Sequence, residues 1–134
     1  MAHVYRNEIQ KNIDSYKSSF SSPNHRVGFS MKANHNPVIL SMMKDNALDA
    51  VTVSGYEILL ALRTGFLGSQ IFYNGVGKQR WEIEIAVTNS CFLTVDSLFD
   101  AELISQVARE EEKVTQVCKM DSETLSQISC YRCY

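Results

Sequence analysis

Long apolar runs and charge of one sign are both missing from this 134-residue sequence. No uninterrupted apolar stretch approaches the roughly 18 to 20 residues that a membrane-spanning helix needs, and residues 1–10 are polar and mixed in charge. We therefore expect neither a membrane anchor nor a signal peptide. The 13 basic and 15 acidic residues give a formal charge of -2, so no electrostatic argument favours nucleic acid, and a small molecule or a protein is the expected partner.

Cysteine is present but lacks the arrangement of a disulfide framework. Cys91 stands alone in an apolar run, whereas Cys118, Cys130 and Cys133 crowd the end of the chain. This asymmetry argues against disulfides and favours a reducing compartment. Because Cys130 and Cys133 form a single pair without a second pair or a following histidine, we expect no zinc site.

Proline is scarce, and the two prolines punctuate a repeated pattern. Apolar positions in residues 7–20 recur every three or four residues, which predicts a helix that ends before Pro23. Pro37 is predicted to open a second helix, since its missing N–H costs nothing there. The pattern then gives four strand-helix pairs in all: 26–31 with 38–43, 50–53 with 57–63, 70–73 with 81–87, and 91–95 with 99–109.

Strands that alternate with helices of this length imply a parallel sheet with right-handed crossovers, so the predicted fold class is α/β. Gly65 and Asn89 are predicted to end their helices, which keeps the connections short. Pattern alone does not decide between a closed barrel and an open sheet. Residues 114–117 are typical of the start of a fifth strand, but the periodicity is lost near Cys118. We expect one domain over 1–117 and a divergent, disordered tail over 118–134.

One lysine stands where parallel α/β proteins gather their active-site residues. Lys32 follows the first predicted strand, at its carboxyl end. An amine in a partly desolvated pocket is neutral more often than an amine in water, and a neutral amine can condense with an aldehyde. On position alone, a surface lysine at a strand end is the commoner explanation. The residues around Lys32 favour an active-site lysine over a surface lysine.

Four short blocks resemble the signatures of one enzyme family. Residues 29–34 read Phe-Ser-Met-Lys-Ala-Asn, which is similar to the aromatic-x-x-Lys-Ala-Asn motif of diaminopimelate decarboxylases and related fold-type III enzymes. The other blocks follow in the family's order: Val-Ser-Gly-Tyr-Glu at 53–57, Asn-Gly-Val-Gly-Lys at 74–78 and Val-Asp-Ser-Leu-Phe-Asp at 95–100. Each falls where a predicted strand passes into a helix, on the rim of loops that forms the mouth of a (β/α) barrel.

The resemblance implies a partial (β/α)8 TIM barrel of the alanine-racemase-like type, with about four βα units and pyridoxal 5'-phosphate bound at its mouth. Lys32 would be the catalytic lysine that binds the cofactor covalently. The residues expected to contact the cofactor are, besides Lys32, Asn34, Ser54, Asn74 and Gly75. No metal is implied.

The residues themselves leave alternatives open at three places. Ser54 can equally cap the helix that follows it. The two glycines of 74–78, together with the charge of Lys78, could form a loop that holds an anion, although such a loop is more often plain. Phe72, Tyr73 and Trp81 are predicted to pack in the core rather than to form a stacking platform.

The implied substrate is meso-diaminopimelate, which the reaction converts to L-lysine and carbon dioxide. Val51 stands where many bacterial members and the ornithine decarboxylases carry aspartate, and block 74–78 resembles the diaminopimelate branch more than the ornithine branch. The family suggests a homodimer without nucleic-acid or membrane partners. We expect a cytoplasmic location, or a plastid if a transit peptide is missing from the chain.

The sequence is too short for the whole enzyme that the resemblance implies. A complete barrel needs about 250 residues, so the chain holds roughly half of one. The glycine-rich segments that cradle the cofactor phosphate and the acidic residue opposite the pyridine nitrogen are not found. We therefore expect a truncated, inactive fragment. The alternatives are a non-catalytic interaction partner of full-length decarboxylase subunits and a small open α/β domain that binds another phosphate compound.

Overall fold

The computed structural model describes residues 2–21, 25–119 and 129–133. Within them a first helix is followed by four strand-helix pairs, which confirms the predicted order. The elements are α1 (Ala2–Ser18), β1 (Gly28–Ser30), α2 (Pro37–Asp45), β2 (Asp49–Thr52), α3 (Gly55–Thr64), a short 3-10 turn (Gly68–Gln70), β3 (Ile71–Tyr73), α4 (Arg80–Thr88), β4 (Phe92–Val95), α5 (Leu98–Glu110), β5 (Thr115–Lys119) and β6 (Ser129–Cys133).

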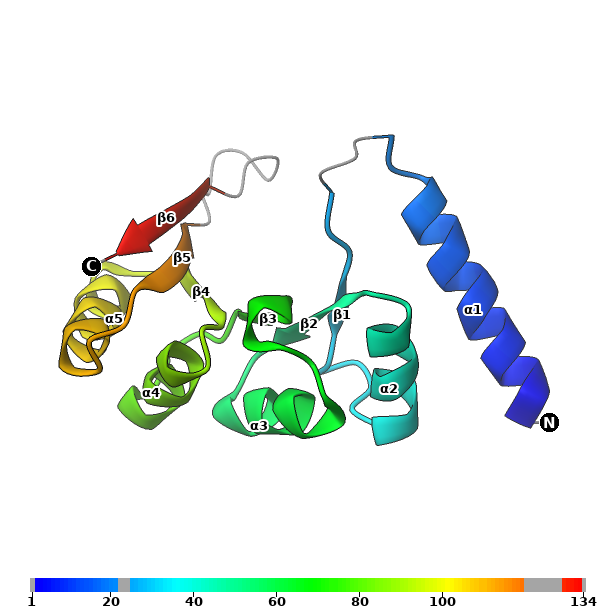
Figure 1. Ribbon diagram of the computed structural model, residues 1–134, viewed down its shortest axis with the longest axis horizontal. Helices are drawn as coiled ribbons and strands as arrows, with labels where there is room; N and C mark the ends of the chain where they lie inside the picture. The colour runs from blue at the N-terminus through cyan, green and yellow to red at the C-terminus, as the bar shows by residue number, and fades with distance from the viewer. Residues whose placement is uncertain (1, 22–24, 120–128, 134) are drawn as a thin grey trace.

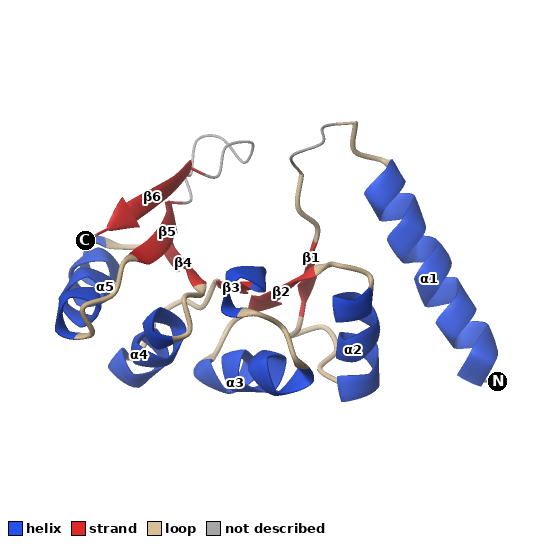
Figure 2. Ribbon diagram, viewed as in Figure 1, coloured by secondary structure: helices blue, strands red, loops and turns tan. Residues whose placement is uncertain are grey.

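The strands form a single curved sheet in the order β1-β2-β3-β4-β5-β6. The first five are parallel, each paired with the next in sequence, and β6 is antiparallel to β5. Helices α2 to α5 form an outer row along one side of the sheet (Figure 1), and the strands lie inside the arc (Figure 2). An open doubly wound sheet would carry helices on both faces. The arrangement is therefore part of a (β/α) barrel, a choice that the sequence pattern alone left open.

The predicted helix-end signals Pro37, Gly65 and Asn89 act as expected, and the cap at Asn36 was not predicted. Asn36 precedes α2, and its Oδ1 accepts a hydrogen bond of 2.9 Å from the Val38 N–H, while Pro37 occupies the first turn. Gly65 follows α3 with a φ of 96°, a left-handed conformation that glycine adopts without a Cβ penalty. Asn89 directly follows α4. Short connections then return the chain to the next parallel strand.

The core lies between the sheet and its outer helices. Successive strand residues point to opposite faces, so alternate positions of adjacent strands meet on the helical side. The strand residues buried there include Ala50, Ile71, Tyr73, Leu93 and Val117, and the helices cover them with Leu40, Ile58, Ile83 and Ile104. This buried layer holds the helices against the curved sheet and so sets the positions of the loops between them.

On the opposite, concave face of the sheet, an aromatic pair and one cation pack together. Phe72 and Phe92 are neighbours in the strand register, and their rings stack with centroids 4.6 Å apart. The Arg26 guanidinium lies over both rings, at 4.8 and 5.1 Å, and pairs with the Asp49 carboxylate at 2.6 and 2.7 Å. Because Asp49 begins β2, this cluster sits toward the amino-terminal end of the sheet, away from the loops that follow the strands.

Helix α1 begins at Ala2 and ends at Ser18, earlier at both ends than the predicted range of 7–20. It packs beside α2 through the buried side chain of Ile13 and through two hydrogen bonds, of 2.7 and 3.0 Å, between the amides of Gln10 and Asn46. Within the described residues, no helix is both long enough and apolar enough to cross a membrane.

The end of the chain is more regular than its composition indicates. β5 runs on to Lys119, and residues 129–133 of the expected tail form β6 against it. Backbone pairing explains the difference, since an open strand edge can be satisfied by a partner strand whatever its side-chain pattern. Residues 120–128 lie outside the described part, and the predicted disorder of the tail stays a prediction.

Candidate active site

The four family-like blocks all lie on one rim of the sheet. Each follows a parallel strand, in the loops after β1, β2, β3 and β4. Because parallel strands share one direction, their carboxyl ends meet at the same edge. The fold therefore gathers blocks that are some twenty residues apart in sequence.

Lys32 occupies the turn directly after β1. Met31 extends the strand pairing by donating its N–H to the Val51 carbonyl at 2.9 Å, and its side chain is fully buried on the helical side. Lys32 lies in the turn that follows, where the Ala33 N–H donates to the Ser30 carbonyl at 3.2 Å and the Asn34 N–H donates to the Met31 carbonyl at 3.1 Å. Its side chain is exposed and makes no hydrogen bond or ion pair with any residue that the structure describes. The amine is accessible to a ligand but is not shielded from water.

In this structure the side chains of Asn34 and Ser54 accept hydrogen bonds from backbone N–H groups. The Oδ1 of Asn34 accepts a hydrogen bond of 3.0 Å from the Asn36 N–H and so shapes the loop before α2. The Oγ of Ser54 accepts a bond of 3.3 Å from the Glu57 N–H, while the Glu57 carboxylate accepts one of 2.8 Å from the Val53 N–H. The capping interpretation of Ser54 is therefore confirmed. Contacts of Asn34 and Ser54 with a cofactor remain predictions.

Asn74 and Gly75 join the second loop to the third. The Asn74 N–H donates to the Thr52 carbonyl at 2.8 Å, and its Oδ1 accepts a bond of 3.0 Å from the Thr94 hydroxyl. The Asn74 Nδ2 donors have no partner among the described residues. A Cβ on Gly75 would lie 2.7 Å from the Val53 carbonyl oxygen, closer than real Cβ contacts allow. Glycine thus permits the approach that brings this loop against the one that carries Ser54.

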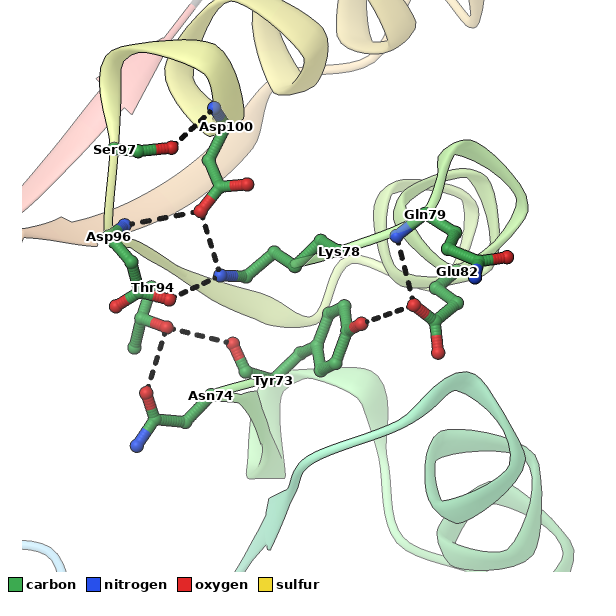
Figure 3. Close-up of polar contacts among 9 residues, drawn as sticks. All are labelled: Tyr73, Asn74, Lys78, Gln79, Glu82, Thr94, Asp96, Ser97 and Asp100. Atoms are coloured by element: carbon green, nitrogen blue, oxygen red, sulfur yellow. Dashed lines mark hydrogen bonds and ion pairs between the residues drawn. The ribbon is translucent and has the colours of Figure 1, made fainter. Parts of the chain in front are cut away.

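Lys78 has the least exposed charged side chain of the rim loops. Its burial argues against the interpretation that loop 74–78 binds an anion. Its side chain is 0% exposed and its Nζ lies 2.8 Å from Asp96 Oδ2 and 3.4 Å from Asp100 Oδ2 (Figure 3). Two carboxylates therefore already neutralise this ammonium, and its site is closed to water. Lys78 binds the third loop to the fourth rather than serving a phosphate.

Glu82, in the first turn of α4, accepts three hydrogen bonds within the same network. They come from the Gly55 N–H at 2.7 Å, the Tyr73 hydroxyl at 2.7 Å and the Gln79 N–H at 3.0 Å. Burial opposes ionisation, but these bonds and the nearby ammonium together lower the pKa of Glu82. Burial and the bond to this carboxylate raise the pKa of Tyr73. The pair is thus held as a carboxylate and a neutral phenol.

The aromatic predictions hold in part. Tyr73 is buried in the core as predicted, at 1% exposure. Phe72 precedes it in the strand and therefore points to the opposite, concave face, where it is half-buried and stacks on Phe92. Trp81 is 36% exposed and meets Tyr56 edge-on, with ring centroids 5.3 Å apart. It does not enter the core because it stands in the first turn of α4, where it packs across the start of α3 at Gly55.

Sequence similarity decides the family. Residues 6–130 match the family described as "Pyridoxal-dependent decarboxylase, pyridoxal binding domain". The chain belongs to this family. The resemblance that the four blocks indicated is thereby confirmed, as is the barrel type of the fold.

Relatives of this decarboxylase-family chain include a probable chloroplastic diaminopimelate decarboxylase of Oryza sativa subsp. japonica, 31% identical over 92% of this chain and 26% of the relative. The diaminopimelate decarboxylase of Bacteroides thetaiotaomicron is 35% identical over 71% of this chain and 25% of its own length. Among solved structures, the Helicobacter pylori diaminopimelate decarboxylase complexed with L-lysine superposes with a TM-score of 0.81 at 30% identity, over 85% of this chain and 29% of that one. The chain therefore spans about a quarter of the length of the curated relatives it matches.

The residues of this family domain fit one end of a pyridoxal phosphate molecule. Lys32 offers an accessible amine to the aldehyde, and the Asn74 amide offers two donors on the same rim. The described residues offer no exposed cation in loop 74–78 for the phosphate, because Lys78 is enclosed. The described residues thus provide an amine and an amide for the reactive end of the cofactor, and loop 74–78 provides no cation for its phosphate.

The sequence interpretation missed Glu82 as a site residue. The spacing of Gln79 and Glu82 is that of a capping box, which marks the start of a helix. That signal identifies the bond to the Gln79 N–H. The bond to the Gly55 N–H crosses to another loop, and only the packing of α3 against α4 creates it.

Proposed function

We propose that this chain supplies the cofactor-binding lysine and part of the rim of a pyridoxal-phosphate-dependent amino-acid decarboxylase of the diaminopimelate type. The substrate would be meso-diaminopimelate, and the products L-lysine and carbon dioxide. The observation that carries the proposal is Lys32, an accessible amine at the carboxyl end of β1 in a domain of the pyridoxal-binding family. The named relatives support the diaminopimelate branch.

Each rim residue has a distinct task in this proposal. Lys32 would hold the aldehyde end of the cofactor covalently until the amino group of the substrate bonds to the same carbon and displaces the lysine amine. Asn74 donates its amide N–H groups at the mouth, and Gly75 leaves room for the backbone to approach. Ser54 fixes the start of α3 beside them. Pyridoxal phosphate, when bound, accepts the electron pair that is left as carbon dioxide departs.

The isolated chain is expected to show little or no turnover. Its lysine is exposed rather than enclosed, and the described rim offers no free cation for a phosphate in loop 74–78. Electrostatic stabilisation depends on a water-excluded site, which half a barrel does not provide. We place the chain in a reducing compartment, either the cytoplasm or a plastid, and expect the complete enzyme to be a homodimer.

Reductive trapping tests the proposal directly. Pyridoxal phosphate and borohydride are added to the purified chain, and peptide mass mapping then compares the label on Lys32 with the label on Lys11, whose side chain is 76% exposed. The proposal predicts preferential labelling of Lys32, which Lys32→Arg abolishes while Lys11 keeps its label. Labelling that follows exposure alone, with Lys11 equal to or above Lys32, would overturn the proposal.

A second candidate, a non-catalytic partner of full-length decarboxylase subunits, is favoured by the apolar side chains on the rim. Tyr56, Val76, Leu98 and Phe99 are between 68 and 92% exposed, all near the starts of helices α3 to α5. Exposed apolar side chains that gather on one rim mark interaction surfaces, and these four lie in the loops and first helical turns of the same rim. Co-purification of the chain with a full-length relative supports this function, whereas a monodisperse monomer that ignores the relative contradicts it.

A further inference from the structure

We infer that Glu82 is a positioning residue that sets the second and third rim loops against each other, and so aligns the residues expected to hold the cofactor. This inference rests on the proposed function. Glu82 itself lies in helix α4 and is 9% exposed. It acts through neighbours and touches no reacting atom.

The three donors that Glu82 engages come from three segments. The Gly55 N–H belongs to the first residue of α3, directly after Ser54. The Tyr73 hydroxyl comes from the last residue of β3, directly before Asn74. The Gln79 N–H marks the start of α4. One carboxylate therefore fixes the chain beside both Ser54 and Asn74.

The packing around Gly55 makes this contact specific. A Cβ at Gly55 would lie 2.5 Å from the Trp81 ring and 2.9 Å from the Glu82 Cγ, so only glycine lets α3 and α4 approach this closely. The N–H of Gly55 then meets Glu82 Oε1 in a buried environment. In such a place the bond is strong, and an unpaired partner is costly.

A carboxylate is required because all three partners are donors. An amide in the same place keeps one acceptor oxygen and presents an NH2 group instead of the other. In Glu82→Gln, at least one backbone N–H therefore faces a donor. The shape and volume of the side chain stay the same, which makes this variant a test of the hydrogen bonds rather than of packing.

The positioning role is tested by the ratio of Lys32 label to Lys11 label in the borohydride experiment. Glu82→Gln is expected to lower this ratio roughly tenfold, the factor that corresponds to one charge-assisted hydrogen bond. The pyridoxal phosphate concentration that gives half-maximal Lys32 labelling is expected to rise, while labelling of Lys11 stays as in the wild type.

Asp49→Asn is the matched control. Asp49 is also a buried carboxylate that accepts from a neighbouring segment, through its pair with Arg26, but it lies at the opposite end of β2. A general loss of stability would change the label ratio in both variants. The positioning role predicts a change in Glu82→Gln and no change in Asp49→Asn at equal stability, as measured by urea unfolding.

The outcomes separate this inference from the proposed function. If the wild type shows no preference for Lys32, the proposed function fails. If the wild type shows the preference and Glu82→Gln retains it, only the positioning role is refuted. Should Glu82→Gln fail to fold by far-UV circular dichroism, Glu82→Asp takes its place, since it keeps the charge but draws the carboxylate back from the Gly55 N–H. An unchanged ratio in Glu82→Asp would likewise overturn the inference.

Discussion

Removal of the Lys78 ammonium is expected to destabilise the domain strongly. Lys78→Met keeps most of the side-chain volume but leaves Asp96 and Asp100 without their cation. The Asp100 side chain is 4% exposed and cannot be hydrated in place, whereas Asp96 at 27% recovers part of its hydration. Loss of one partner of a buried pair costs about 3–5 kcal/mol, and the partial hydration of Asp96 favours the lower end, about 3 kcal/mol. That is a large share of the roughly 5–15 kcal/mol that stabilises a typical domain.

Urea unfolding followed by far-UV circular dichroism measures this loss. With a slope of about 1–3 kcal/mol per molar urea, 3 kcal/mol shifts the midpoint by roughly 1–3 M. Lys44→Met is the control, because the Lys44–Asp45 pair at 3.3 Å is solvent-accessible and is expected to contribute less than about 1 kcal/mol. The triple variant Lys78→Met, Asp96→Asn, Asp100→Asn should regain part of the loss, since no charge stays buried. A Lys78→Met midpoint equal to that of Lys44→Met would refute the reasoning.

Three further outcomes follow from the same structure. The native pKa of Glu82 lies below its ordinary 4.5, so the stability that its ionisation contributes is fully present above about pH 4.5 and is lost as the pH falls through the native value. The difference in unfolding free energy between wild type and Glu82→Gln should thus shrink in acid, and a difference that is constant down to about pH 3 would contradict this. Burial raises the pKa of the Cys91 thiol to about 12, so iodoacetamide at about pH 8 should modify Cys91 only in urea, and rapid native modification would contradict its burial. Ser54→Ala should cost about 1 kcal/mol of stability through loss of the cap on the Glu57 N–H, with Ser54→Asp as a control that keeps an acceptor.

Most of the fold could be predicted from the sequence because its signals are local. Alternation of apolar residues, Pro37 at a helix start and Gly65 at a helix end depend on neighbours within a few positions, and the structure follows all of them. The structure at the end of the chain was harder to predict from the sequence. β6 pairs with β5 across residues 120–128, and such pairing depends on a backbone edge rather than on a side-chain period.

The sequence by itself determined the position of Lys32 after the first strand, the order of the four blocks and the family that they share. Only the tertiary structure decided what the charged residues of those blocks do. Lys78 sits beside two glycines in sequence and was compatible with an anion site, yet the fold encloses it between Asp96 and Asp100. Likewise, the bond from Gly55 to Glu82 spans 27 positions. Whether a charge is free or neutralised depends on groups that are distant in sequence, and only the close approach of neighbouring loops determines which groups those are.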